Sequence, residues 1–443
     1  MTFYWTCIKI AIRMGRFFMN IDDFIEFLNE SPMAYFAVKK AKELLEGAGF
    51  ERLDLKKDFV IREGGKYFVD NNDSALLAFS VGKLDEIFFK IVGSHTDSPG
   101  FRIKAKPYMN KESMSVLNTE VYGGPIINTW LDRPLSFGGR VILKSDDIFN
   151  PRKELVKFDK DMLIIPNLAI HMNRQVNDGI KLNPQVHTLP LVGLCDEKIE
   201  NEDHMKTLLS SELGVGKDDV LDYDLYLYDR QKASLLGENS EFISSGRLDN
   251  LASFYTSLKA LIDAKDHEGI NIIIASDNEE VGSGTKMGAD SSFIETVFER
   301  ILLGLGKGRQ DYFKALEKSF MISSDMAHAI HPNYTEKADP INRPKLGKGI
   351  VIKYAASKAY ASDGESAAIL MSICEKAGIS YQTFHNRSDM RGGSTIGPIT
   401  SRRLNVRTVD VGGPMLSMHS VRELMAAKDL YYMQRCFEEF FKI

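Results

Sequence analysis

Residues 87–98 read IFFKIVGSHTDS, an apolar run that leads directly into a polar stretch containing a histidine. The run from Ile87 to Val92 has the length and the β-branched and aromatic composition of a buried strand. The pattern returns at residues 270–280, INIIIASDNEE, where an apolar run ends at two adjacent glutamates. Open α/β sheets place their chemistry in the loops that follow strands. We therefore predict an α/β sheet with a functional site at the carboxyl ends of its strands.

The remaining pattern divides the chain into two parts. Alternating helix and strand signals continue on both sides of a central region, with further strands predicted at 66–69, 75–81, 320–323, 381–384 and 405–411 and helices at 251–264, 366–377 and 421–440. Between about residues 102 and 229, short β-type runs alternate with Gly, Pro and Asn turns instead. We predict a discontinuous α/β domain, residues 21–101 and 239–443, interrupted by a β-rich domain at 102–238.

Composition places the chain among ordinary globular proteins. It has 443 residues, of which 44% are hydrophobic and 26% charged, with a formal net charge of −5. No Lys/Arg-rich stripe points to nucleic acid, and no apolar run is long enough to span a bilayer. The four cysteines are scattered without a CxxC pair, which favours free thiols and a cytoplasmic location. Residues 1–20 lack the ordered features of a signal peptide and are interpreted as an N-terminal arm or a misplaced start.

Histidines and acids occur in five clusters, most of them directly after a predicted strand. These clusters are His95 with Asp97, Asp249, Glu279 with Glu280, Asp325 with His328 and His331, and His419. Carboxylates brought together at one sheet edge repel each other unless cations lie between them. Any single member is more often a turn residue or a helix cap, but the coincidence of all five favours a metal centre. Mixed imidazole and carboxylate ligands suit zinc, cobalt or manganese.

Five motifs, read in chain order, resemble the M18 family of metallo-aminopeptidases, and in particular the bacterial relatives of aspartyl aminopeptidase. They are HTDS (95–98), SGRLDN (245–250), DNEEVGS (277–283), SDMAHAIHPNY (324–334) and MHSVRE (418–423). The resemblance extends from about Ile21 to the end of the chain. It implies an enzyme that removes N-terminal residues from peptides, with two divalent metal ions per subunit, zinc first and cobalt or manganese as alternatives.

The resemblance also implies roles for individual residues. Asp249 bridges the two metals, His95 and Asp325 complete one site, and Glu280 and His419 complete the other. Glu279 serves as the general base, and Asp97 orients the His95 imidazole. The bond between Asp249 and Asn250 is expected to be cis, which is rare for a non-proline residue.

The resemblance extends to three further residues. His171, in the motif NLAIHMNR (167–174), matches a histidine that reaches into a neighbouring subunit's active site, although a hydrogen-bonded loop histidine is the alternative. The family forms dimers through the inserted domain and assembles into dodecamers. Lys358 and Tyr360 match a substrate-binding region, but their spacing departs from the aspartyl pattern, so acidic and neutral first residues both stay open.

Two other functions also stay open at this stage. A deacylase or a carboxypeptidase can use the same dinuclear scaffold with a Glu-Glu pair. A non-enzymatic metal-holding or assembly protein can keep the fold, although loss of a ligand or of Glu279 would then be expected, and all are present.

Overall fold

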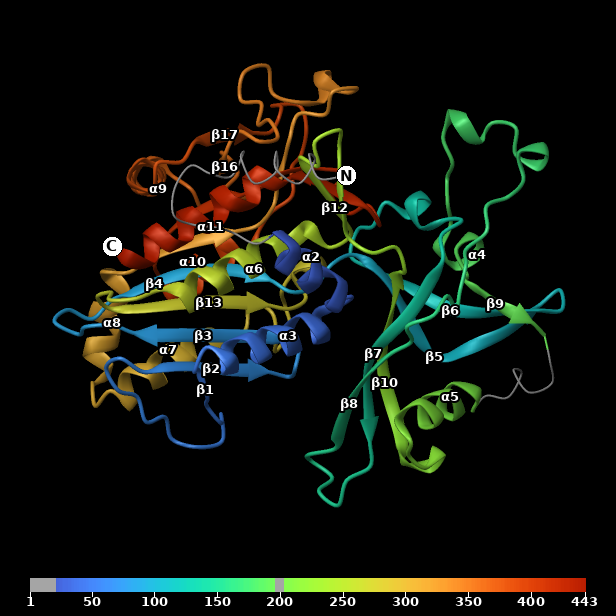
Figure 1. Cartoon of the computed structure of the whole chain (residues 1–443), viewed down its shortest axis with the longest axis horizontal. Coiled ribbons are helices and arrows are strands. Elements are labelled where there is room, and N and C mark those ends of the chain that lie inside the picture. Colours follow the sequence, from blue (N-terminus) through green and yellow to red (C-terminus); the bar gives the residue numbers. More distant parts are fainter. Residues whose placement is uncertain (1–20, 196–202) are drawn as a thin grey trace, which may run out of the picture.

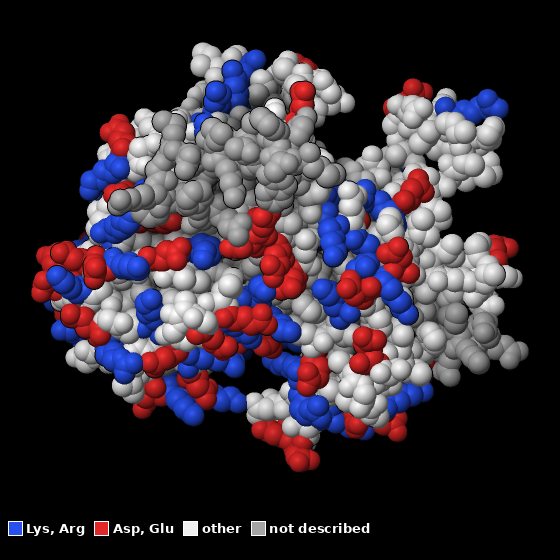
Figure 2. Space-filling view, in the orientation of Figure 1, with Lys and Arg blue, Asp and Glu red and all other residues white. Residues whose placement is uncertain are grey.

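The computed structural model describes residues 21–195 and 203–443, and Figure 1 shows how their elements are arranged. The predicted arm at residues 1–20 lies outside this part of the chain. Within the described ranges, no helix has both the length and the apolar character needed to cross a membrane. On the face shown in Figure 2, basic and acidic side chains are interspersed.

A nine-stranded mixed sheet forms the centre of the larger lobe (Figure 1). Its order is β1 (Glu51–Arg52), β2 (Lys66–Asn71), β3 (Ala75–Val81), β13 (Ile270–Ser276), β4 (Phe89–His95), β14 (Phe320–Ser324), β18 (Arg407–Gly412), β16 (Ile350–Tyr354) and β17 (Tyr381–His385). The four strands β13, β4, β14 and β18 are mutually parallel, whereas β3 and β16 run antiparallel to them. The predicted mixed α/β fold is confirmed.

Helices cover both faces of this sheet, which explains why its central strands are apolar on both sides. One core packs against α2 (Ile21–Glu30), α3 (Ala34–Gly47), α6 (Leu248–Asp263), α9 (Gly364–Ala377) and α11 (Ala427–Lys442). The other packs against α7 (Phe293–Gly304), α8 (Arg309–Glu317) and α10 (Ile396–Leu404). Phe89 and Ile91 enter the second core and Val92 enters the first, as the alternation of side chains along a strand requires.

A separate six-stranded antiparallel sheet forms the smaller lobe, and we call residues 100–229 that contain it the insert. Its order is β8 (Arg152–Lys157), β7 (Leu135–Leu143), β10 (Val220–Asp229), β5 (Gly100–Lys111), β6 (Met114–Tyr122) and β9 (Leu191–Leu194). It has its own buried core, which includes Phe101, Phe137 and Leu225 and is covered by α5 (His204–Leu213) through Leu209. The predicted domain bounds themselves stay a prediction.

A third, five-stranded sheet corrects the sequence reading near the carboxyl terminus. It contains β11 (Ser234–Leu236), β12 (Phe242–Ser245), β20 (Glu423–Ala426), β19 (Pro414–Leu416) and β15 (Ala327–His328). The prediction of one helix over 421–440 is wrong for its first residues, because β20 pairs antiparallel with β12 and α11 begins only at Ala427. Tertiary pairing over four residues overrides the local helical pattern there.

Candidate metal centre

Three of the predicted ligand segments reach one edge of the large sheet because their strands are parallel neighbours. His95 is the last residue of β4, and Asp325 follows β14 directly. Glu280 lies in η5 (Glu279–Val281), the short helix after β13. Since β13, β4 and β14 are adjacent and parallel, their carboxyl ends place these side chains together.

The other two predicted ligands follow strands of the five-stranded sheet. Asp249 lies at the start of α6, just after β12, and His419 lies in the loop between β19 and β20. His419 has a φ of 67°, a left-handed conformation that is uncommon outside glycine. The peptide bond between Asp249 and Asn250 is cis, as predicted.

Asp249 lies between two groups of donors, and each of its carboxylate oxygens faces a different histidine. Its Oδ1 is 3.5 Å from Nε2 of His95, and its Oδ2 is 3.4 Å from Nε2 of His419. His95 Nε2 is also 3.5 Å from Oδ1 of Asp325, and His419 Nε2 is 3.3 Å from Oε2 of Glu280. The five side chains therefore form two triads that share Asp249.

This arrangement fits cations better than hydrogen bonds alone. Within each triad one donor atom per residue lies within 4.8 Å of the others. Oδ1 of Asp249 and Oε1 of Glu280 are buried and have no hydrogen-bond partner among the described residues. Unpaired carboxylate oxygens are costly to bury unless an ion satisfies them. Imidazole and carboxylate donors are those that zinc takes in proteins.

The pKa shifts of the ligands follow from burial and from crowding of charge. Burial first, then the carboxylate of Asp249, raises the pKa of Glu280 to about 9. Burial lowers the pKa of His419, but its contacts with Asp249 and Glu280 outweigh this and raise it to about 10. Burial also raises the pKa of Glu279, to about 8, with Asp325 and Asp97 adding to the effect against His95. Without cations, this centre therefore retains protons at neutral pH.

Comparison with known proteins agrees with this geometry. The model of the family described as aminopeptidase I zinc metalloprotease (M18) matches residues 27–441. A probable M18 family aminopeptidase 2 of Clostridium novyi is 50% identical over 425 residues, covering 95% of this chain and 98% of that protein.

The chain belongs to the M18 family of metallo-aminopeptidases.

Further M18 proteins resemble it along nearly the whole chain. A probable M18 family aminopeptidase 2 of Pseudomonas entomophila is 40% identical, covering 94% of this chain and 97% of that protein. A cryo-EM structure of the Ape4 and Nbr1 complex has a TM-score of 0.90 at 36% identity and covers 95% of this chain and 84% of that one. A structure of the mApe1 dodecamer of S. cerevesiae has a TM-score of 0.82 at 25% identity, covering 95% of each.

Two buried carboxylates in this M18 protein hold the backbone of the ligand segments. Glu423 accepts hydrogen bonds from the N–H of His419 (2.7 Å) and of Asp249 (3.1 Å). Asp97 accepts from the N–H of Glu279 and of Glu280, both at 3.1 Å. Sequence reasoning assigned no role to Glu423 because it placed that residue in a helix, although Glu423 closes the MHSVRE motif.

Asp97 also faces the imidazole that it was predicted to orient. Its Oδ1 is 3.3 Å from Nδ1 of His95, and its backbone carbonyl is 3.1 Å from the same nitrogen. Glu279 lies beside this pair, and one of its carboxylate oxygens groups with donors of His95 and Glu280. The structure therefore places the predicted base next to the ligands, while its role stays a prediction.

A buried lysine that the sequence reasoning missed lies at the other side of the centre. Lys353, on β16, is 3% exposed, and its Nζ is 3.6 Å from Oδ2 of Asp325. It donates a hydrogen bond to the carbonyl of Met326 and lies under the ring of Tyr360. The strand β16 buries side chains on both of its faces, and Lys353 continues its apolar run. A lysine in such a run was the sequence signal that could have revealed this residue, because a buried cation needs a partner.

The other predicted residues lie apart from the two triads. Tyr360 is buried and contacts Lys353, whereas Lys358 is exposed in the turn after β16. His171 is exposed on η2 (Ile170–Met172), in a segment of the insert that extends away from the large sheet (Figure 1). The rings of His328 and His331 pack against Phe384 and Tyr334, and among the described residues neither histidine belongs to a group of side chains that could hold a metal ion.

Proposed function

We propose that this M18 protein is a two-metal aminopeptidase that removes the first residue of peptides, with Glu279 as the general base. The observation that carries the proposal is the sharing of Asp249 between two donor triads. Each triad combines one imidazole with carboxylates, and the shared carboxylate offers one oxygen to each. His95 and Asp325 would complete one site, and Glu280 and His419 the other.

The residues around the centre would divide the work of hydrolysis. Bound zinc ions supply Lewis acidity, which lowers the pKa of water and polarises a carbonyl. Glu279 would take a proton from the attacking water and pass it to the leaving amine. Its pKa of about 8 in the metal-free protein comes mainly from burial, and neighbouring cations would lower it and free the carboxylate to accept a proton. Asp97 would hold the His95 imidazole in one orientation.

Assembly is part of the proposal, because His171 faces solvent far along the insert. We infer a dimer, with dodecamers as the larger assembly, in which His171 of one subunit completes the site of the next. The exposed side chains of Leu168, Ile170 and Met172 around it support a protein contact. The mApe1 neighbour is a dodecamer, which supports the same inference by likeness. Size-exclusion chromatography with light scattering tests it, and a strict monomer would refute it.

We also infer a cytoplasmic location. Cys374 and Cys436 are buried and are free thiols in the described part of the chain. Free buried thiols are usual in a reducing compartment. Fractionation of cells that express the protein with a small tag would test this inference.

One assay separates the proposed function from its rivals. The protein is stripped with a chelator, reloaded with zinc, cobalt or manganese, and offered chromogenic amides of Asp, Glu, Leu and Lys beside their N-acetylated forms and C-terminal substrates. An aminopeptidase cleaves only substrates with a free α-amine, and the ranking of the four residues decides between acidic and neutral preference. Cleavage confined to acylated substrates would identify a deacylase, and a metal-loaded protein inactive on every substrate would support a binding role.

A further inference from the structure

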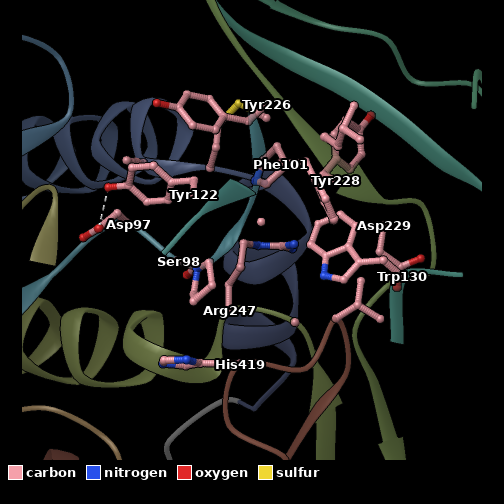
Figure 3. A pocket seen from close by; sticks show the side chains of 18 of the residues that line it. Asp97, Ser98, Phe101, Tyr122, Trp130, Tyr226, Tyr228, Asp229, Arg247 and His419 are labelled. Carbon is pink, nitrogen blue, oxygen red and sulfur yellow. Dashed lines mark hydrogen bonds between the residues drawn. The ribbon is translucent and has the colours of Figure 1, made fainter. Parts of the chain in front are cut away.

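Tyr122 joins the insert to the metal centre of the large sheet. It is the last residue of β6, and Figure 3 shows its hydroxyl directed at Asp97. The hydroxyl donates a hydrogen bond to Oδ2 of Asp97 (2.7 Å) and accepts one from Nδ2 of Asn278 (2.9 Å). Asp97 follows β4 and Asn278 follows β13, so a single hydroxyl bridges the ends of two neighbouring strands.

The first partner, Asp97, controls three groups of the centre. Its Oδ1 lies 3.3 Å from Nδ1 of His95 and accepts the N–H of Glu279, and its Oδ2 accepts the N–H of Glu280. A carboxylate that makes all these contacts must keep a fixed rotation. The hydrogen bond from Tyr122 to Oδ2 keeps the Asp97 carboxylate from rotating. Through Asp97, the hydroxyl therefore fixes His95 and both glutamates.

The second partner, Asn278, starts the η5 turn that carries the two glutamates. It has a φ of 60°, its N–H donates to Asp277, and its side-chain oxygen accepts from Thr285 at 2.7 Å. The remaining polar end of the side chain, Nδ2, is the atom bound to Tyr122. The hydroxyl therefore holds the backbone of Glu279 and Glu280 from both sides.

Tyr122 is itself held by the insert. Its ring packs edge-on against Tyr226 of β10, with ring centroids 5.7 Å apart and an interplanar angle of 85°. Both residues line a small cavity of about 70 Å³ between the two lobes (Figure 3). Burial, with Asp97 and Asp277 adding to it, raises the pKa of Tyr122 far above its ordinary value, so the hydroxyl keeps its proton and stays a donor.

We propose that Tyr122 is a positioning residue through which the insert fixes the orientation of His95 and of the Glu279–Glu280 turn. The inference rests on the proposed function for the meaning of a loss in kcat, but its effect on metal binding does not depend on any activity. A consequence is that a contact which shifts the insert also changes the metal centre, although the hydrogen bonds of the Tyr122 hydroxyl go to Asp97 and Asn278 rather than to the five proposed ligands.

The test compares Tyr122→Phe with Tyr223→Phe. The control removes another buried hydroxyl of the same sheet, which donates to the carbonyls of Lys104 and Ala105 inside the insert. Zinc dissociation constants, kcat, KM and the visible spectrum of the cobalt-substituted protein are measured for both. We expect Tyr122→Phe to weaken zinc binding by about 10- to 100-fold and to lower kcat by a similar factor, which is the range for groups that orient metal ligands. KM should stay within about twofold of the wild type, and the cobalt spectrum should change.

The control and a second variant keep the outcome decisive. Tyr223→Phe is expected to match the wild type in zinc affinity and spectrum, and Asn278→Ala to change both in the same direction as Tyr122→Phe. If Tyr122→Phe fails to fold, Asn278→Ala carries the test. A wild-type protein that binds zinc but cleaves no peptide refutes the proposed function, while the zinc affinities still decide the role of Tyr122. Equal zinc affinity and spectrum in Tyr122→Phe and Tyr223→Phe would overturn the inference.

Discussion

The carboxylate of Glu423 accepts a hydrogen bond from the backbone N–H of Asp249 at 3.1 Å, across the junction of two segments distant in sequence. Its other oxygen accepts from the N–H of His419 at 2.7 Å, so one buried acid fixes the backbone of His419 and of the Asp249 that the two triads share. Asp97 likewise accepts the backbone N–H groups of Glu280, a member of one triad, and of Glu279 beside it. Three of the proposed ligands, Asp249, His419 and Glu280, are thus held through their backbones as well.

Replacement of Glu423 by Gln should therefore weaken the metal centre. The amide presents an N–H₂ group to one of the two backbone N–H groups, so one acceptor is lost and one clash is gained. We expect zinc affinity to fall by about 10- to 100-fold, measured by competition with a chromophoric chelator. Glu365→Gln, which weakens an exposed ion pair with Arg407, serves as the control. Unchanged zinc affinity in Glu423→Gln would show that the two backbone contacts are dispensable.

Replacement of Glu279 by Gln should separate chemistry from metal binding. Glu279 is not a member of either triad that shares Asp249, so both metals should stay bound. Loss of a general base costs about 100- to 10,000-fold in kcat. Metal content by elemental analysis and steady-state kinetics check both parts. Glu280→Gln is the contrasting variant, and it should lose metal as well as activity. Near-normal turnover of Glu279→Gln would remove this residue from the mechanism.

Removal of the metals should make stability depend on pH in a defined direction. The folded-state pKa values of Glu280, about 9, and of His419, about 10, lie above the ordinary values of 4.5 and 6.5. A raised pKa means that the folded protein holds a proton that the unfolded chain releases, so stability is lost as pH rises from about 4.5 toward 9 or 10. The pKa of Asp249 is lowered instead, so its protonation changes the stability only below about pH 3.8, outside this pH range.

Thermal unfolding of the chelated protein should therefore show a midpoint that falls as pH rises from neutral to mildly alkaline. Zinc requires deprotonated ligands, so its apparent affinity should rise over the same range and its binding should release protons, which calorimetry in buffers of different ionisation enthalpy detects. Glu280→Gln should flatten the dependence of the chelated protein. A midpoint that climbs with pH in the metal-free protein would contradict the assignment.

The buried lysine beside the centre should matter more than the exposed one predicted from the sequence. Lys353 pairs with Asp325, and its loss removes a buried cation from Oδ2 of that carboxylate, whose Oδ1 contacts His95 Nε2. We expect Lys353→Met to destabilise the metal-free protein by about 3–5 kcal/mol, in denaturant unfolding. Lys358→Met, on the exposed turn, should stay within about 0.5 kcal/mol of the wild type. Equal stabilities of the two variants would show that the pair is not structural.

Mixed assemblies should reveal whether His171 acts on a neighbouring subunit. His171→Ala and Glu279→Gln are each expected to be nearly inactive alone. The two variants are mixed in equal amounts, dissociated and reassembled. A site that takes Glu279 from one subunit and His171 from the other is then intact, and random pairing makes about a quarter of all sites active. Activity measured against a mixture that was never dissociated provides the control. No recovery after verified exchange of subunits would place His171 outside the shared site.

Local patterns in the sequence determined much of this protein. The apolar runs at 87–92 and 270–275 identified central strands, and the polar residues after them identified the predicted ligands His95 and Glu280, because the end of a strand is a property of the local chain. The wrong helix at 421–426 marks the limit, since four residues can read as helix or strand until a partner such as β12 is present.

Only the tertiary structure decided which side chains support those ligands. The contacts of Glu423 with Asp249, of Lys353 with Asp325 and of Tyr122 with Asp97 each join segments that are far apart along the chain. A buried charge or hydroxyl is tolerated where it forms a hydrogen bond or an ion pair. Whether its partner lies within reach depends on how the three sheets pack. The sequence of either segment alone does not indicate that the two segments lie close together in the fold.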